Sequence, residues 1–551
     1  MSGRRGGARN RAGAASLPSV TLASHRWRRA LAAAAAVLAL CASTSAQPAR
    51  AATSAQPLAF QSLTQLDARM VQASFVDPAN RWPMPVVHVR ILLPDGYATS
   101  GLTYPVLYLL HGAGDTAASW SSNDDGQESL EQFTAGQRVV IVMPDGGAND
   151  IAGWYSDWFN GGAFGPPQWE SFHAGELIDW VQSNYRVRTD RGGRVVAGLS
   201  MGGFGAFSYA ARHPDLFAAA FSFSGFLDTS AIPYAEPAAL DALHSRNGTP
   251  TAAIWGTWQD DEVRWRGHNP ADLVGNLHDV PLWMATGQGV PGGPAPDDGD
   301  AAGLATESAI YGTNQTFDTK ATLAGVHPSF NPYPMGGHNW WHWQNDLHNA
   351  WPLIMQAFST PHAAPASFDY ESVEPSFDAW GWSATAHRDT TEFLQMQHAG
   401  VRGLTLVGSG SVDLVTPPSY TPNRHYAVRV SGSTASTATP VAVADGSGRL
   451  HIAVTLGPSH TLQQYTAQER VAETGDPAYW ETATVSIGPP HGGSSTGGTA
   501  LAPLSATSAD VTSLPNTAAR AAGGGAVAAA LGIAAAAVLA RRRRRRNGAD
   551  G

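Results

Sequence analysis

The chain has 551 residues, enough for two or three domains and a large buried core. Charged residues make up 14% of it and the formal net charge is −10, so the composition does not indicate nucleic acid as a partner. Its one cysteine, Cys41, lies in a segment that we expect to be removed, which excludes a cysteine nucleophile, a disulfide and a cysteine metal site from the mature protein.

Residues 1–51 have the features of a secretory signal peptide. Arg26, Arg28 and Arg29 precede an apolar run over residues 30–41, and Ala-Arg-Ala at 49–51 offers a cleavage site. The run is too short to span a membrane comfortably. Leu-Ala-Leu-Cys at 38–41 leaves a lipoprotein signal open, and the arginine pair leaves a twin-arginine signal open. All three signals predict an exported protein.

Strand-like and helix-like segments alternate over the next part of the chain. Apolar β-rich runs are followed by turns or by segments of helical spacing, an order that predicts a mostly parallel sheet with helices on both faces. We bound this α/β domain at residues 52–365. Strands are expected over 86–91, 105–110, 139–143, 195–197, 218–223 and 280–285, and helices over 169–185 and from 201 onward.

The sequence Gly198-Leu199-Ser200-Met201-Gly202 is a G-x-S-x-G motif between an expected strand and an expected helix. In α/β-hydrolases this motif forms a sharp turn that exposes the serine hydroxyl above the sheet. The turn needs small flanking residues, and glycine supplies them on both sides. Ser200 is therefore the predicted nucleophile, and the domain is predicted to have the α/β-hydrolase fold.

A serine nucleophile needs a base, and the chain order of this fold puts the histidine last. His338 follows a glycine pair late in the domain, as expected of a loop that delivers an imidazole to the end of the sheet. His342 and His348 are rivals, but they fall in what looks like the next helix. His338 and His342 also have the i, i+4 spacing of zinc ligands, but no third ligand stands in a matching motif, so we expect no metal.

Spacing alone does not identify the carboxylate that would complete a Ser-acid-His catalytic triad. The expected strand over 280–285 ends at Thr286-Gly287-Gln288-Gly289, without a carboxylate at its tip. The downstream candidates are Asp297, Asp298, Asp300 and Glu307.

Several short stretches between residues 84 and 358 resemble sequence blocks of a known family, in the same order. They are Trp154–Trp158, Trp169–Phe172, Gly198–Met201, Ser224–Leu227, Thr313–Phe317 and Gly337–Trp340. On these stretches the region is similar to the antigen 85-type mycolyltransferases, within the esterase family of α/β-hydrolases that includes esterase D-like enzymes.

The resemblance implies a serine esterase or acyltransferase that acts on carboxylic esters, with lipid or sugar esters as candidates and no cofactor. It implies Glu307 as the acid, because the family glutamate lies the same short step before the Asn-Gln-Thr-Phe block. It also implies an oxyanion hole from the backbone N–H groups of Met201 and Ala113. We further expect Trp158 and Trp340, in two of the blocks, to contact substrate.

Two positions depart from the mycolyltransferase pattern. His111 stands where those enzymes have Asp, and Gly114 stands where they have an Arg that helps to bind the polar substrate. The resemblance therefore does not extend to trehalose or mycolate as substrates. A protein of another class is the alternative: a wall-displayed binding protein whose hydrolase domain is catalytically silent, as in some relatives that lack the triad.

Beyond residue 365 the pattern changes to short alternating runs separated by Gly, Ser and Pro turns. Val412 and Leu414 would share one face, and similar faces recur around Val428 and Val454. This pattern predicts a small all-β, sandwich-like module over residues 366–486. Residues 487–513 are rich in Gly, Ser, Thr and Pro, and we interpret them as a flexible linker.

Residues 514–551 resemble a Gram-positive cell-wall sorting signal. Leu-Pro-Asn-Thr-Ala at Leu514–Ala518 is followed by an apolar run to Ala540 and then by six arginines, Arg541–Arg546. The fifth residue of such motifs is usually Gly, and here it is Ala. We expect a sortase as partner and a secreted, wall- or surface-anchored protein. The alternative is a C-terminal transmembrane segment retained as a membrane anchor by the arginines.

Overall fold

A computed structural model describes residues 57–78, 82, 84–122, 129–148, 151–159, 167–231, 252–432, 441–471 and 480–490, all in one compact unit. The predicted signal peptide, residues 491–513 of the predicted linker and the predicted sorting signal with its apolar run lie outside these residues. Among the helices within them, none is both long and apolar enough to cross a membrane.

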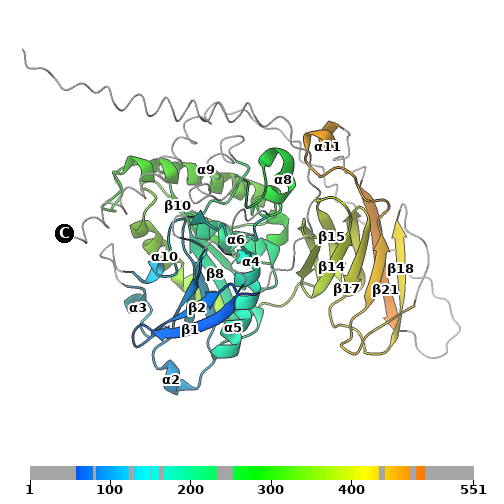
Figure 1. Ribbon diagram of the computed structural model, residues 1–551, viewed down its shortest axis with the longest axis horizontal. Helices are drawn as coiled ribbons and strands as arrows, with labels where there is room; N and C mark the ends of the chain where they lie inside the picture. The colour runs from blue at the N-terminus through cyan, green and yellow to red at the C-terminus, as the bar shows by residue number, and fades with distance from the viewer. Residues whose placement is uncertain are drawn as a thin grey trace, which may run out of the picture. The chain divides into compact units, whose positions relative to one another are not determined.

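A nine-stranded sheet forms the centre of the α/β region (Figure 1). Its order is β1-β2-β3-β5-β4-β8-β9-β10-β11, with antiparallel pairs from β1 to β5 and parallel pairs from β5 to β11. The strands are β1 Ala59–Gln65, β2 Met70–Val76, β3 Val87–Leu92, β4 Val106–Leu110, β5 Val140–Pro144, β8 Arg194–Leu199, β9 Ala220–Phe223, β10 Leu282–Gly287 and β11 Ser329–Tyr333. The short strands β6 Gly147–Ala148 and β7 Ile151–Ala152 pair separately.

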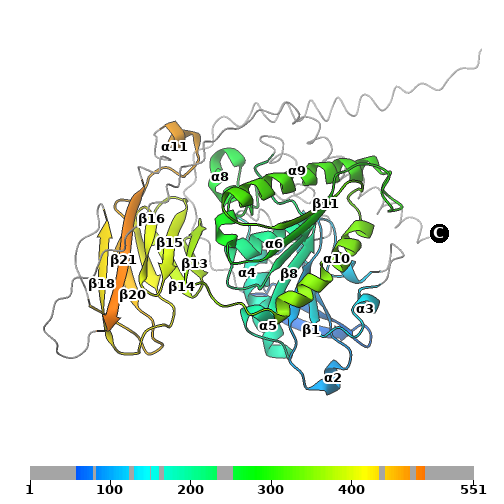
Figure 2. The ribbon, with the colours of Figure 1, turned by 180° about the vertical axis from the view of Figure 1, so that it is seen from behind.

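Helices cover both faces of this sheet (Figures 1 and 2). Successive side chains of a strand point to opposite faces, so Val196 of β8 packs in the core with α5 and α6, whereas Val195 and Ala197 pack in the core with α10. Both faces are therefore apolar, as in parallel sheets generally. This architecture confirms the predicted α/β-hydrolase fold. The helices are α2 Tyr97–Ser100, α3 Leu130–Phe133, α4 Trp169–Ser171, α5 Leu177–Asn184, α6 Met201–Arg212, α8 Trp258–Arg266, α9 Ala301–Leu323, α10 Trp340–Ser359 and α11 Ala467–Val471.

Capping side chains define the starts of α9 and α10, the two helices that follow β10 and β11. Asp300 begins α9 and accepts a hydrogen bond from the backbone N–H of Gly303 at 3.0 Å. Asn339 begins α10 and accepts one from His342 N–H at 3.3 Å. Asn and Asp are preferred at these positions because they satisfy N–H groups that have no partner within the helix. The caps fix the two loops that lead out of β10 and β11.

Antiparallel sheets replace the parallel one after residue 366. A six-stranded sheet has the order β12-β15-β16-β21-β18-β19 and a four-stranded sheet the order β13-β14-β17-β20. Their inward side chains, including Val412, Leu414, Val428 and Val454, share one buried core, which fits the predicted all-β module. The strands are β12 Ser367–Ser372, β13 Ser376–Ala379, β14 Trp382–His387, β15 Leu394–Gly400, β16 Gly403–Gly408, β17 Ser411–Val415, β18 His425–Gly432, β19 Val441–Val443, β20 His451–Thr455 and β21 Glu481–Pro490.

The first four residues of the predicted linker, 487–490, belong to a strand. Strand β21 continues to Pro490, and Ile487 pairs with Val428 and is 8% exposed. The pairing with β18 supplies backbone partners that the Gly-Pro-Pro composition does not reveal. The other domain boundaries stay predictions.

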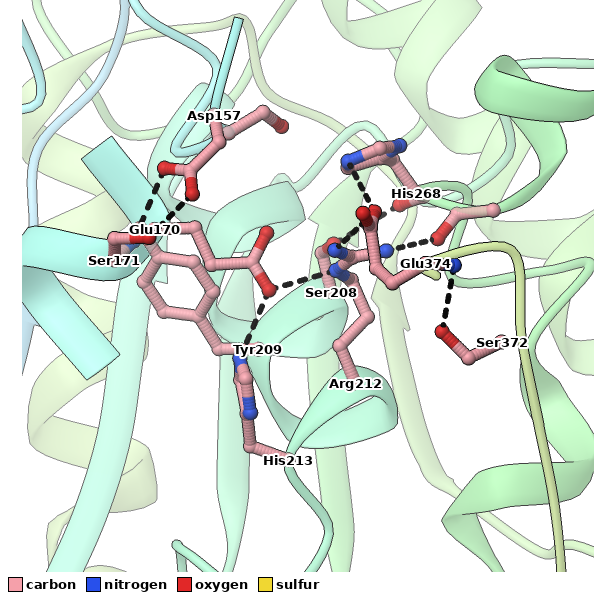
Figure 3. Close-up of polar contacts among 12 residues, drawn as sticks. Asp157, Glu170, Ser171, Ser208, Tyr209, Arg212, His213, His268, Ser372 and Glu374 are labelled. Atoms are coloured by element: carbon pink, nitrogen blue, oxygen red, sulfur yellow. Dashed lines mark hydrogen bonds and ion pairs between the residues drawn. The ribbon is translucent and has the colours of Figure 1, made fainter. Parts of the chain in front are cut away.

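The C-terminal end of α6 contacts the chain just beyond β12 (Figure 3). The Arg212 guanidinium donates to Glu170 Oε1 at 2.7 Å and to Glu374 Oε1 at 2.9 Å, and Tyr370 Oη donates to the Arg212 carbonyl at 2.6 Å. His213 Nε2 donates to the same Glu170 oxygen at 2.8 Å. The helix that begins after Ser200 is thus fastened at its far end by residues of the all-β region.

Candidate active site

Ser200 lies in the tight turn between β8 and α6. Its backbone has φ 53° and ψ −120°, a conformation that is uncommon for a residue with a side chain, and its N–H donates to Phe223 O at 2.9 Å. The flanking glycines are sterically required, because a Cβ on Gly198 would lie 2.3 Å from Gly202 O. The turn exposes the serine hydroxyl at the carboxyl end of the parallel strands.

His338 bridges Ser200 and Glu307. Its Nε2 lies 2.9 Å from Ser200 Oγ and its Nδ1 lies 2.7 Å from Glu307 Oε2. An ionised carboxylate only accepts hydrogen bonds, so Nδ1–H donates to Glu307 and Nε2 accepts from the serine hydroxyl. This arrangement prepares Nε2 to take a proton from Ser200.

Glu307, in the second turn of α9, is completely buried, and both of its carboxylate oxygens accept hydrogen bonds. Besides His338, it accepts from Ser224 Oγ at 2.7 Å, Thr286 Oγ1 at 2.9 Å and Gly287 N–H at 2.7 Å. A buried charge is tolerated only where such donors compensate for lost water. Sequence reasoning missed Ser224 and Thr286, although polar side chains at the carboxyl ends of neighbouring parallel strands signal a site.

The rival acids have other partners. Asp300 is the cap of α9, and Asp298 accepts from His342 Nε2 at 2.8 Å. Because the two ring nitrogens of His338 already contact Ser200 and Glu307, neither Asp298 nor Asp300 accepts a hydrogen bond from this imidazole.

The rival histidines also lie away from Ser200. His342 contacts Asp298, and His348 stacks on Phe133 with ring centroids 3.9 Å apart. His338 and His342 therefore contact different carboxylates in spite of their i, i+4 spacing. Among the residues described, no group of three or more His, Cys, Asp or Glu side chains is arranged to hold a metal ion.

The two expected oxyanion donors lie in segments next to the nucleophile. Met201 is the first residue of α6, where backbone N–H groups have no acceptor within the helix. Ala113 follows Gly112, and a Cβ on Gly112 would lie 3.4 Å from Ser200 Cβ and 2.6 Å from Leu199 Cδ1. A side chain at this position would therefore collide with Leu199, the residue before Ser200.

Three hydrogen bonds hold this loop. His111 Nε2 accepts from Gly146 N–H at 2.7 Å, so its Nδ1 carries the proton and donates to Gly112 O at 2.8 Å. Tyr155 Oη donates to His111 O at 2.9 Å. The orientation of the Gly112–Ala113 peptide is therefore determined by buried side chains that the His-Gly pair in the sequence only partly indicates.

The two tryptophans expected to contact substrate differ in exposure. Trp158 is 3% exposed, and its indole N–H donates to Gly153 O at 3.0 Å, which does not favour a substrate contact. Trp340 is partly buried and packs edge-on against Trp120 and Trp343, and the Trp343 ring lies 4.7 Å from the His338 ring. Both roles stay predictions, and Trp340 has the better position.

A second buried carboxyl group, Asp346 of α10, lies near Glu307. Burial, followed by the negative charge of Glu307, raises the pKa of Asp346 well above its usual value. Burial, with the charges of Asp346 and Glu307, also raises the pKa of Tyr333. A raised pKa favours the uncharged form of each group, so the charge of Glu307 and the burial of both groups act in the same direction.

Comparison with known proteins shows which family this chain is similar to. The sequence profile of the family described as "Putative esterase" matches residues 85–354. Esterase Rv1288 of Mycobacterium tuberculosis is 34% identical over 254 residues, which cover 45% of this chain and 52% of that protein. This chain thus spans about half the length of the first curated relatives it matches.

The diacylglycerol acyltransferase/mycolyltransferase Ag85A of the same species is 30% identical over 280 residues, 49% of this chain and 79% of that protein. Among solved structures, M. tuberculosis MPT51 (FbpC1) is 26% identical and covers 50% of this chain and 94% of its own, with a TM-score of 0.40. A ferulic acid esterase is 23% identical and covers 52% and 98%, with a TM-score of 0.39. By its likeness to Ag85A over most of that protein, the chain belongs to the esterase family of α/β-hydrolases that contains the antigen 85-type acyltransferases.

Proposed function

We propose that this chain is a serine ester hydrolase or acyltransferase that works through an acyl-enzyme, with Ser200 as nucleophile, His338 as base and Glu307 as the acid of the triad. The observation that carries the proposal is the pair of hydrogen bonds from His338, 2.9 Å to Ser200 Oγ and 2.7 Å to Glu307 Oε2. The relatives named as esterases and acyltransferases support the same reaction class.

In the first half-reaction, Ser200 Oγ attacks the ester carbonyl carbon while His338 Nε2 takes the hydroxyl proton. The carbonyl π electrons move onto oxygen, and the N–H groups of Met201 and Ala113 stabilise this oxyanion. One such donor is worth roughly 2.7–4 kcal/mol in other enzymes. When the tetrahedral intermediate collapses, the bond to the leaving oxygen breaks and His338 returns the proton to the alcohol.

In the second half-reaction, water or an acceptor alcohol attacks the acyl-enzyme. His338 deprotonates the attacking oxygen and then protonates Ser200 Oγ as the acyl group leaves. Water gives hydrolysis and an alcohol gives acyl transfer. Glu307 keeps Nδ1 protonated and stabilises the imidazolium in both halves. The acyl chain and the acceptor are expected among lipid and sugar esters, the classes that the family resemblance suggests.

The test compares Ser200→Ala with Ser208→Ala. Ser208 lies in α6, the helix that follows Ser200, but it donates to His268 O at 2.9 Å rather than to His338. Ser200→Ala should lower p-nitrophenyl ester turnover by about 10⁴- to 10⁶-fold and abolish labelling by a fluorophosphonate probe. Ser208→Ala should keep both. A wild-type chain that neither turns over short and long acyl esters nor reacts with the probe would instead be the silent binding protein.

We also propose that the protein is exported and joined to the cell wall after Thr517, with the signal peptide at its start and the apolar run and arginines as the retention segment. Moving six cationic side chains across a membrane is costly, so the chain would pause there while a sortase acts. Intact-mass analysis of wall-released protein tests this. Finding Arg541–Arg546 on the mature chain would show a retained membrane anchor instead.

A further inference from the structure

Asp298 lies in the loop between β10 and α9, and its carboxylate contacts the loop that carries His338. Its side chain is only 4% exposed. Oδ1 accepts from Gly337 N–H at 2.9 Å, Asn339 Nδ2 at 3.2 Å and His342 Nε2 at 2.8 Å. One carboxylate oxygen therefore holds the residues on both sides of His338 and the first turn of α10.

The second carboxylate oxygen ties Asp298 to its own loop. Oδ2 accepts from Ala295 N–H at 2.9 Å, so the four hydrogen bonds of the carboxylate join its own loop to the loop of His338 and the first turn of α10. Burial acts to raise the pKa of Asp298, but the N–H donors of Gly337 and Ala295 and the ring of His342 outweigh it and hold that pKa below its usual value. The group is thus an ionised acceptor at neutral pH.

The ring of His342 is fixed in position by packing on both Tyr333 and the loop before His338. Its ring stacks on Tyr333 with centroids 5.0 Å apart and an interplanar angle of 18°. A Cβ on Gly336, whose φ is +132°, would lie 2.6 Å from His342 Nε2, so the loop before His338 passes directly over this ring. The ring supports the loop, and Asp298 ties the two together.

From these contacts we infer that Asp298 and His342 are positioning residues, which hold His338 Nε2 at hydrogen-bonding distance from Ser200 without touching the substrate. The inference rests on the proposed function. By this inference, the loop between β10 and α9 contributes to the reaction although the loop supplies no residue of the triad. The backbone N–H of His338, which donates to Gly303 O at 3.0 Å, completes the attachment.

Misplacing a catalytic group by about 1 Å can cost about 100-fold in rate. Asp298→Asn keeps the shape of the side chain but loses its charge, and its amide group opposes at least one of the present N–H donors. His342→Leu removes one of the three donors to Oδ1. We expect each variant to lower kcat by about 10- to 100-fold with KM little changed, because neither residue contacts substrate.

The matched control is Asp300→Asn, the same chemical change two residues further along. Asn caps helices as well as Asp does, so kcat should stay within about twofold of the wild type. A further variant, His342→Gln, offers an amide donor close to the position of Nε2 and should recover part of the loss in His342→Leu.

The measurement is kcat per active site, with sites counted by fluorophosphonate titration of Ser200. A purely structural role would lower the number of titratable sites and leave kcat per site unchanged. A positioning role lowers kcat per site, and it also weakens or broadens the deshielded proton resonance of His338 Nδ1–H. Wild-type kcat per site in both Asp298→Asn and His342→Leu would overturn the inference, as would an equal loss in Asp300→Asn. A wild-type protein that does not react with the probe would instead overturn the proposed function.

Discussion

Removing the guanidinium of Arg212 should destabilise the protein strongly. The side chains of Arg212 and Glu170 are 9% and 6% exposed, and the guanidinium also donates to Gly267 O. In Arg212→Met, Glu170 would remain buried with His213 as the donor it keeps (Figure 3). Breaking a buried ion pair by removing one partner costs about 3–5 kcal/mol, because a desolvated charge is left behind. The Glu374 contact adds little, since that side chain is 38% exposed.

The assay is urea unfolding followed by tryptophan fluorescence, with Asp413→Asn as control. Asp413 pairs with His387 on the surface, where both side chains are more than half exposed, so its loss should change the free energy of unfolding by less than about 1 kcal/mol. The double variant Glu170→Gln/Arg212→Met should cost less than Arg212→Met alone, because no charge is then buried. A loss below about 1 kcal/mol in Arg212→Met, or a larger loss in the double variant, would refute the reasoning.

The pH dependence gives a second check on the same pair. Burial acts to raise the pKa of Glu170, but Arg212 and His213 outweigh it and hold that pKa below its ordinary value of 4.5. The stabilisation is therefore complete above this value and is lost as the pH falls below it. In Arg212→Met the pKa should rise instead, so that this variant loses stability with rising pH. The difference from wild type should be larger at about pH 8 than at about pH 5.

Three further predictions concern the active site. Glu307→Gln should lower kcat by about 10³- to 10⁴-fold, because a neutral amide stabilises the imidazolium poorly, while Asp297→Asn should stay near wild type in the same ester assay. Gly112→Ala should lower kcat by about 100-fold, because the added Cβ would lie 2.6 Å from Leu199 Cδ1 and would displace one oxyanion donor. Unchanged kinetics would exclude this loop from the oxyanion hole. Trp340→Ala should raise KM for long acyl esters more than for acetate esters, as measured over a series of chain lengths. An equal change in KM for every ester of the series would exclude Trp340 from the acyl site.

The amino-acid sequence by itself was enough to predict the α/β-hydrolase fold and to single out Ser200 as the candidate nucleophile. Alternation of β-rich and helical segments reports which faces of each element are buried, and this is a local property of the chain. The turn at Ser200 is also local, because the glycines that permit it are its close neighbours in sequence. His338 could be ranked above His342 and His348 for a similar reason, since a glycine pair before a helix indicates a loop.

The partner of His338 depended on tertiary structure. Spacing did not distinguish the four carboxylates between residues 297 and 307 as candidates for the acid of the triad. Only the family resemblance favoured Glu307. The orientation of α9 against the end of β10 brings Glu307 to Thr286 and Gly287, whereas Asp298 turns to the loop before α10. The contact between Arg212 and Glu374, which are 162 positions apart in sequence, could not be predicted from the sequence either. Such contacts depend on how distant segments pack, and a pattern of neighbouring residues does not carry that information.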